Sequence, residues 1–111
     1  MFESLKNIKG MKLIPEGIEI PALYSQENEG DPICHVKLFA LSSNWTWYVI
    51  EYDPESKICF GFVSGFENEL GTFSIEELES LGANIERDLY FSPAPLSEIK
   101  ELHGRSVYGW G

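Results

Sequence analysis

The chain has 111 residues, of which 43% are hydrophobic and 14% are aromatic. This length fits one domain and excludes two, and the apolar content excludes wholesale disorder because it is enough for a buried core. The formal net charge of −10 repels nucleic-acid phosphates, so direct binding to DNA or RNA is not expected. The acidity has two explanations, which are ordinary solubility or an acidic face that meets a basic protein.

Residues 1–12 are interpreted as a leader that precedes a single domain at residues 13–111. The leader carries Lys6, Lys9 and Lys12 but lacks the apolar stretch of a secretory signal. No apolar run in the chain approaches the length that spans a membrane. The sequence therefore predicts a cytoplasmic protein without membrane contact.

The first two predicted strands differ in how many of their faces are apolar. Residues 33–41 alternate, so that one face is expected to meet the core. The core-facing positions are Cys34, Val36, Leu38 and Ala40. Residues 45–52 are apolar or aromatic on both faces, with Trp47 and Glu51 on one face and Tyr48 on the other. A strand covered on both sides is typical of the centre of a sheet.

A turn at Asp53 and Pro54 leads into a third strand at residues 57–66, which we expect to pair antiparallel with the second. The large apolar positions on one of its faces are Ile58, Phe60, Phe62 and Phe66. Gly61 and Gly65 share the other face, where we expect a β-bulge or the close approach of a neighbouring aromatic ring.

The start of a helix at Ser74 is the clearest local signal in the chain. Ser74 and Glu77 form the capping-box pattern, and Phe73 and Leu78 occupy the positions of a hydrophobic staple. Gly82 is expected to end this helix as its C′ residue.

A further strand at residues 84–91 and a last helix at residues 95–103 complete the predicted elements. The expected inward positions of the strand are Ile85, Leu89 and Phe91. Pro95 is expected at the first helical position, and Gly104 is expected to stop the helix. Together the elements predict an α+β fold, with an antiparallel sheet of four to five strands and two or three short helices packed on it.

The two cysteines, Cys34 and Cys59, lie in separate apolar runs and have no closely spaced Cys or His set around them. We expect two buried free thiols, because unpaired cysteine behaves as a small apolar residue. A disulfide between them is the alternative if their strands pair.

Familiar catalytic motifs are missing from the sequence. It contains no Gly-rich phosphate loop, no nucleophile elbow and no zinc-binding His-Glu-x-x-His pattern. Its two histidines have structural interpretations, His35 as a strand residue and His103 as a residue at a helix C-terminus. We therefore predict no catalytic residue, no metal ligand and no cofactor.

An aromatic cluster supplies the first group of candidate binding residues. Trp45, Trp47 and Tyr48 follow Asn44 and the polar turn before it. Such a cluster fills the core of a sheet when it is buried, and it stacks on a peptide, base or sugar when it is exposed. Tyr24 is an additional aromatic candidate at the same kind of surface.

Three consecutive charged residues, Glu86, Arg87 and Asp88, supply the second group. The two carboxylates share one face of the predicted strand. If Arg87 is partly buried it needs a carboxylate partner, for which Glu51 and Glu79 are the candidates. A structural ion pair is one interpretation, and a pair of carboxylates that act as acid and base or hold Mg²⁺ is the other.

Residues 51–80 carry most of the net charge, with eight acidic residues and one basic residue, Lys57. The acidic residues are Glu51, Asp53, Glu55, Glu67, Glu69, Glu76, Glu77 and Glu79. If a basic partner docks, we expect it to dock on this part of the chain.

Several motifs resemble, in their order and spacing, domain-of-unknown-function family 2958. The motifs are Leu23-Tyr24-Ser25-Gln26-Glu27, Asp31-Pro32, Ser43-Asn44-Trp45-Thr46-Trp47-Tyr48, Phe60-Gly61, Glu69-Leu70-Gly71, Phe73-Ser74, Leu78-Glu79, Ile85-Glu86-Arg87-Asp88-Leu89-Tyr90-Phe91, Pro93 and Pro95-Leu96-Ser97-Glu98. The resemblance covers roughly residues 13–99 and implies a bacterial protein without an assigned activity. Members of the family tend to occur among genes of plasmids, phages and conjugative elements, which implies a role in transfer or in countering host defence.

Three hypotheses follow. The leading one is a non-catalytic interaction module of a mobile genetic element, whose acidic face binds a basic protein. The alternative is a small hydrolase-like enzyme or ligand-binding domain with an aromatic and carboxylate cleft. The residues of that cleft are Tyr24, Trp45, Trp47, Glu51, Glu86 and Arg87. The third is a homodimer in which exposed aromatic side chains bury one another.

Overall fold

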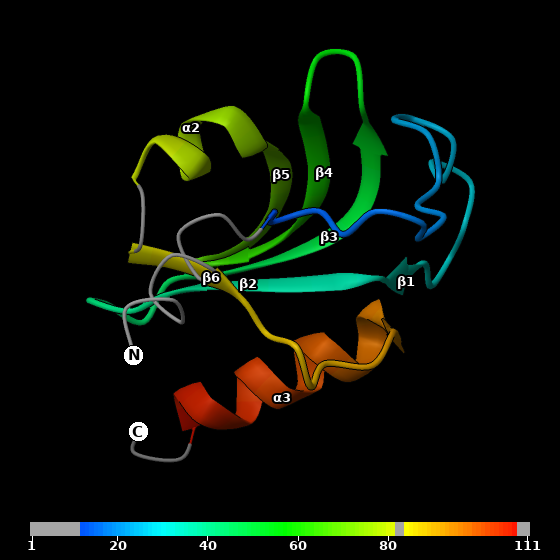
Figure 1. Ribbon diagram of the computed structural model, residues 1–111. Helices are drawn as coiled ribbons and strands as arrows, with labels where there is room; N and C mark the ends of the chain where they lie inside the picture. Colours follow the sequence, from blue (N-terminus) through cyan, green and yellow to red (C-terminus); the bar gives the residue numbers. More distant parts are fainter. Residues whose placement is uncertain (1–11, 82–83, 109–111) are drawn as a thin grey trace.

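The computed structural model describes residues 12–81 and 84–108, with side chains described up to residue 104. Its main sheet has five antiparallel strands in the order β5-β4-β3-β2-β6 (Figure 1). The strands are β2 (Val36–Ala40), β3 (Thr46–Asp53), β4 (Ile58–Ser64), β5 (Asn68–Ser74) and β6 (Ile85–Arg87). A second, two-stranded sheet pairs β1 (Ile33–Cys34) with β7 (Ala94–Pro95). The described helices are α2 (Ile75–Ser80) and α3 (Leu96–Tyr108).

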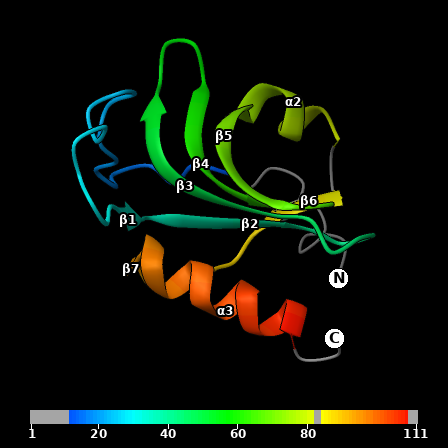
Figure 2. The same cartoon turned by 180° about the vertical axis from the view of Figure 1, so that it is seen from behind.

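The α+β class and the antiparallel sheet are confirmed, as is the central position of β3. The two helices lie on opposite faces of the sheet, α2 on one face and α3 on the other (Figures 1 and 2). The core is therefore split in two by the sheet. The core on the α2 face is formed by Leu13, Val36, Leu38, Trp47, Val49, Cys59, Ile75, Leu78 and Ile85. The core on the α3 face is formed by Cys34, Tyr48, Ile50, Phe62, Leu96 and Ile99.

The predicted first strand is interrupted at His35, which lies between β1 and β2. Cys34 pairs with Ala94 of β7 and belongs to the core on the α3 face. Val36 pairs with Val49 of β3 and belongs to the core on the α2 face. The prediction that Cys34 shares a face with Val36 is therefore wrong, because the chain changes its pairing partner at His35.

The two cysteines are buried and free, as predicted. Burial raises the pKa of the Cys34 thiol and of the Cys59 thiol to about 12. Both side chains therefore stay protonated at neutral pH and pack as small apolar groups.

A β-bulge in β3 changes the face on which Glu51 lies. Val49 pairs with Gly61, but Glu51, two residues later, pairs with Phe60, so Ile50 is the extra residue. The bulge brings Glu51 to the face of Tyr48 and the α3 core, not to the face of Trp47 as predicted. The bulge lies in β3 opposite Gly61, and not in the glycine-bearing strand, where a bulge was one of the two expectations.

Glycine is required at two positions of the hairpin around β4. A Cβ atom added to Gly61 would lie 1.7 Å from the backbone oxygen of Tyr48, and one added to Gly65 would lie 2.5–2.6 Å from ring atoms of Trp45. The predicted close approach of an aromatic ring is thus confirmed at Gly65. Phe66, which was predicted to share a strand face with Ile58, Phe60 and Phe62, is 93% exposed, because β4 ends at Ser64 and the chain turns there.

The start of α2 is confirmed, since the Ser74 hydroxyl accepts a hydrogen bond from the Glu77 N–H at 3.2 Å. Gly82, the predicted end of this helix, lies outside the described residues, as do residues 1–11 of the predicted leader. The strand predicted at residues 84–91 is shorter in the structure, where β6 covers only Ile85–Arg87. Leu89, predicted to face inward, is 61% exposed, whereas Phe91 packs against the core as predicted.

The last helix differs from its prediction at both ends. Pro95 belongs to β7, and the helix continues past Gly104 to Tyr108. Its first turn is held by a distant residue, because the Asp31 carboxylate accepts hydrogen bonds from the N–H and the hydroxyl of Ser97. These bonds lower the pKa of Asp31. His103 is consequently an interior residue of the helix, not its C-terminal residue.

Candidate functional site

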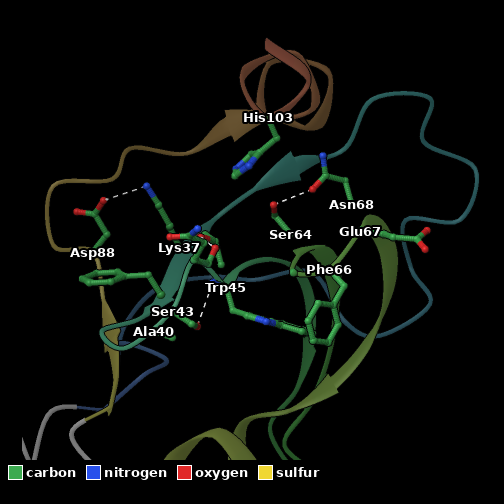
Figure 3. A pocket seen from close by; sticks show the side chains of 14 residues that line it. Lys37, Ala40, Ser43, Trp45, Ser64, Phe66, Glu67, Asn68, Asp88 and His103 are labelled. Carbon is green, nitrogen blue, oxygen red and sulfur yellow. Dashed lines mark hydrogen bonds and ion pairs between the residues drawn. The ribbon is translucent and has the colours of Figure 1, made fainter. Parts of the chain in front are cut away.

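An aromatic pair at the surface consists of the exposed Phe66 and the half-buried Trp45. Their rings meet edge to face with centroids 5.3 Å apart (Figure 3). The centroid of the Trp45 ring also lies 5.9 Å from that of Trp47. Gly65 allows this arrangement, because a side chain there would overlap the Trp45 ring. The turn between β4 and β5 thus presents Phe66 to solvent while Trp45 supports it from beneath.

Two open hollows adjoin this aromatic pair. The first, of about 810 Å³, is bordered by Lys37, Asn44, Asp88 and His103 on the side of β2 and α3. The second, of about 460 Å³, lies on the α2 face of the sheet. Besides the aromatic pair, its lining includes Trp47, Val63, Glu67, Glu69 and Phe73. Glu67 borders both hollows, so a carboxylate stands beside the exposed ring.

Two pairs of polar side chains lie within the first hollow. Lys37 lies 3.6 Å from Asp88, and the Ser64 hydroxyl donates to the Asn68 side-chain oxygen at 2.7 Å (Figure 3). His103 reaches into the hollow from α3. The Ser64 hydroxyl thus donates to an amide oxygen, which is not a general base.

His103 is tied to the core through Tyr48. Its Nε2 atom lies 2.8 Å from the Tyr48 hydroxyl, and the two rings meet edge to face. Burial raises the pKa of Tyr48 to about 12. Burial, together with the positive charge of Lys37, lowers the pKa of His103. The pair is therefore a neutral hydrogen bond that fixes α3 to the sheet.

This pair predicts a pH dependence of stability. Because the pKa of His103 is lower in the folded state, the unfolded state binds its proton first as the pH falls below 6.5, the ordinary histidine value. The free energy of unfolding should thus decrease from pH 7 down to the folded-state pKa of His103. Urea unfolding at several pH values checks this, with His103→Gln expected to show a smaller decrease. His35, whose pKa burial also lowers, supplies the remaining part. An unchanged slope in His103→Gln would contradict the assignment.

Glu51 holds a surface loop in place. It is only 2% exposed, and its two carboxylate oxygens accept hydrogen bonds from the N–H groups of Tyr24 and Gln26, both at 2.7 Å. Tyr24 has a φ of 70°, a left-handed conformation that is unfavourable for a non-glycine residue. The Glu51 carboxylate thus stabilises a strained turn, and both of its oxygens already have partners within the chain.

A third hollow, of about 500 Å³, lies beside this turn on the α3 face. Tyr24, Glu27, Glu29, Leu70 and Lys100 are among the residues that line it.

Arg87 does not form the predicted ion pair with Glu51 or Glu79. Its Nη1 atom donates to the backbone oxygen of Lys12 at 2.7 Å. Asp88, the neighbouring candidate, pairs with Lys37 instead. The segment at residues 86–88 therefore serves to join β6, β2 and the chain near Lys12.

The candidate binding residues are distributed over several places. Asn44, Trp45 and Asp88 border the first hollow, and Trp45 also borders the second together with Trp47. Tyr24 and Glu51 border the third hollow, and Arg87 borders another hollow beside Pro15. Glu86 pairs with Phe39 of β2, and Tyr48 is buried. The six residues of the predicted enzyme cleft thus do not line one cleft. Eleven of the fourteen residues that line the first hollow were not among the candidates, and they include Lys37, Phe66, Glu67 and His103. Glu67 was counted with the acidic residues of the 51–80 segment, whereas Phe66 was assigned to the third strand.

Within residues 12–81 and 84–108, no group of three or more His, Cys, Asp or Glu side chains is placed to hold a metal ion. No helix in these ranges has the length and apolar character needed to cross a membrane.

The fold and its open hollows define a small α+β protein with an aromatic and acidic surface. The chain belongs to the family described as Protein of unknown function (DUF2958), whose model matches residues 11–105. This confirms the resemblance identified from the sequence motifs. Comparisons with curated proteins and with solved structures give no match.

Proposed function

We propose that this protein is a non-catalytic interaction module that binds a basic protein through its acidic face. We define the acidic face as the exposed carboxylates of the β4–β5 turn, β5 and α2. They are Glu67, Glu69, Glu76, Glu77 and Glu79. Three consecutive elements of the chain carry these charges, and the described residues among them include no base, so a positively charged surface is attracted there.

The observation that carries the proposal is Phe66. A large ring that is 93% exposed, supported by Trp45 and flanked by Glu67, has the composition of an interface hot spot. Aromatic rings also attract lysine and arginine side chains through cation–π interactions. The acidic residues beside the ring strengthen this preference for cations.

The setting of the proposal is a mobile genetic element in a bacterial cytoplasm, as the family resemblance implies. The partner that fits best is a basic protein that handles DNA. An acidic protein with a net charge of −10 resembles the phosphate array that such a partner recognises.

Charge reversal tests the proposal. The partner is captured from extract of the native host, identified by mass spectrometry and purified, and its dissociation constant is then measured at low and high salt. The triple variant Glu67→Lys, Glu69→Lys and Glu76→Lys is expected to bind at least about tenfold more weakly, with less salt dependence.

The matched control is the triple variant Glu19→Lys, Glu55→Lys and Glu98→Lys. It changes the net charge by the same amount at exposed residues outside the acidic face. Its affinity should stay within about twofold of the unmodified protein. Equal affinities for both triple variants would refute the role of the acidic face.

A further inference from the structure

β5 is an edge strand of the described sheet. Among the strands that the structure describes it pairs with β4 alone, and it is seven residues long, whereas the strand at the opposite edge, β6, has three residues. An edge strand exposes backbone N–H and C=O groups that can pair with another extended chain.

Two hydrogen bonds at the ends of β5 show which of its groups face outward. The Gly65 N–H donates to the Glu67 oxygen at 3.0 Å, and the Ile75 N–H donates to the Lys57 oxygen at 2.9 Å. Both bonds follow the same register as the β4–β5 pairing. Because hydrogen-bonded pairs alternate in an antiparallel ladder, the odd-numbered residues of β5 bond to β4. The backbone groups of Leu70 and Thr72 consequently point away from the sheet.

These outward groups have no partner in the part of the chain that the structure describes. The β4–β5 ladder uses the odd-numbered residues of β5, and no other hydrogen bond of the described residues involves the backbone N–H or C=O of Leu70 or Thr72. Both residues are exposed. The chain therefore offers four aligned backbone groups to a partner.

The two faces of β5 each carry one of the hollows described above. The second hollow lies on the α2 face and the third on the α3 face, and Gly71 and Thr72 border both. Gly71 lacks a side chain and has no atom within 4 Å of an added Cβ, so another backbone can come close at this point. Side chains of an extended peptide alternate between faces, and here each face has a hollow to receive them.

We propose that β5 binds an extended, basic segment of the partner as an additional strand of the sheet, an inference that rests on the proposed function. Glu67 and Glu69 in the second hollow favour lysine or arginine at positions that face them. In the third hollow Glu27 and Glu29 outnumber the single base, Lys100, and favour the same residues. A second copy of this chain fits less well, because its own β5 would bring like charges together.

The test begins with a displayed library of random peptides, which is selected on the full chain. Enriched peptides are expected to carry lysine or arginine at positions that face either hollow, so that neighbouring positions can both be basic. One enriched peptide is then synthesised in two N-methylated forms, each blocking the amides of one alternate set. One form should bind at least about tenfold more weakly and the other should bind almost normally, because only one set of amides faces β5.

Two measurements on the protein complete the test. Thr72→Pro removes one outward N–H but no carboxylate, and proline is tolerated at the free side of an edge strand. This variant should bind the peptide at least about tenfold more weakly. In the unmodified protein, the peptide should slow hydrogen exchange at the amides of Leu70 and Thr72, a readout that does not depend on any variant folding.

Three results would overturn strand addition. The first is a library that yields no enriched peptide, and the second is an enriched peptide that leaves the hydrogen exchange of Leu70 and Thr72 unchanged. The third is a captured basic protein that needs the acidic face but binds Thr72→Pro with full affinity, and in this case the proposed function would stand. If charge reversal on the acidic face does not weaken the binding of the partner, the proposed function itself is refuted.

Discussion

Replacing Gly61 with alanine is expected to destabilise the protein by at least about 3 kcal/mol, or to prevent folding. The added methyl group would lie 1.7 Å from the backbone oxygen of Tyr48 and 3.3 Å from the Cα atom of Val49. Backbone atoms cannot rotate away as the end of a side chain can. The strands β3 and β4 would have to separate where the bulge brings them closest, at the centre of the sheet.

Gly71→Ala is the matched control for this substitution. Gly71 pairs directly with Gly61 across β4 and β5, yet no atom lies within 4 Å of a Cβ added to it. Alanine there should change the free energy of unfolding by less than about 1 kcal/mol, and it lowers the entropy of the unfolded chain.

Thermal and urea unfolding of both variants measure the difference. Gly61→Ala should lower the melting temperature by more than about 10 °C, and Gly71→Ala should leave it nearly unchanged. If the two variants melt together, then the close approach at Gly61 is not a constraint on the sheet.

Local sequence signals predicted those elements of the fold that depend on neighbouring residues. The Ser74 cap and the apolar faces of β3 were predictable, because a capping box and a strand that is apolar on both sides each have a local pattern. The glycine contacts around β4 were predictable in kind, since glycine in a strand indicates a close approach.

Features that depend on distant partners were not predictable. Nothing local indicates that the Asp31 carboxylate caps α3, because 66 residues separate it from Ser97. The bulge at Ile50 cannot be located from a strand whose faces are both apolar, since a one-residue shift leaves the pattern similar. The face of Glu51 was mispredicted for this reason.

The candidate site shows the same division. Asn44 and Trp45 were identified from the aromatic cluster, which is continuous in the sequence. Lys37 and His103 belong to β2 and α3, and only the folded chain brings them to the same hollow. The pairing of His103 with Tyr48 spans 55 residues.

Removing the Glu51 carboxylate is expected to cost about 3 kcal/mol in Glu51→Ala and about half of that in Glu51→Gln. Each oxygen accepts one backbone N–H at 2.7 Å, and hydrogen bonds to a charged acceptor are stronger than neutral ones. Glutamine keeps one acceptor but places an NH₂ group against the other N–H, so one of the two bonds is lost. The exposed Glu55, converted to glutamine, is the matched control and should change stability by less than about 0.5 kcal/mol.

The loop beside Glu51 provides a second readout of the same prediction. Tyr24 adopts its left-handed backbone because the carboxylate holds the N–H groups on either side of Ser25. In Glu51→Ala the amides of Tyr24 and Gln26 should therefore exchange with solvent at least about tenfold faster than in the unmodified protein. Exchange should remain slow at the centre of β3, provided that it is measured where the variant is still folded. Because the third hollow is lined by the same turn, a peptide that binds along β5 should also lose affinity in this variant, whereas Glu55→Gln should bind it normally. Unaltered stability together with unaltered exchange at Tyr24 would show that the turn holds its conformation without the carboxylate.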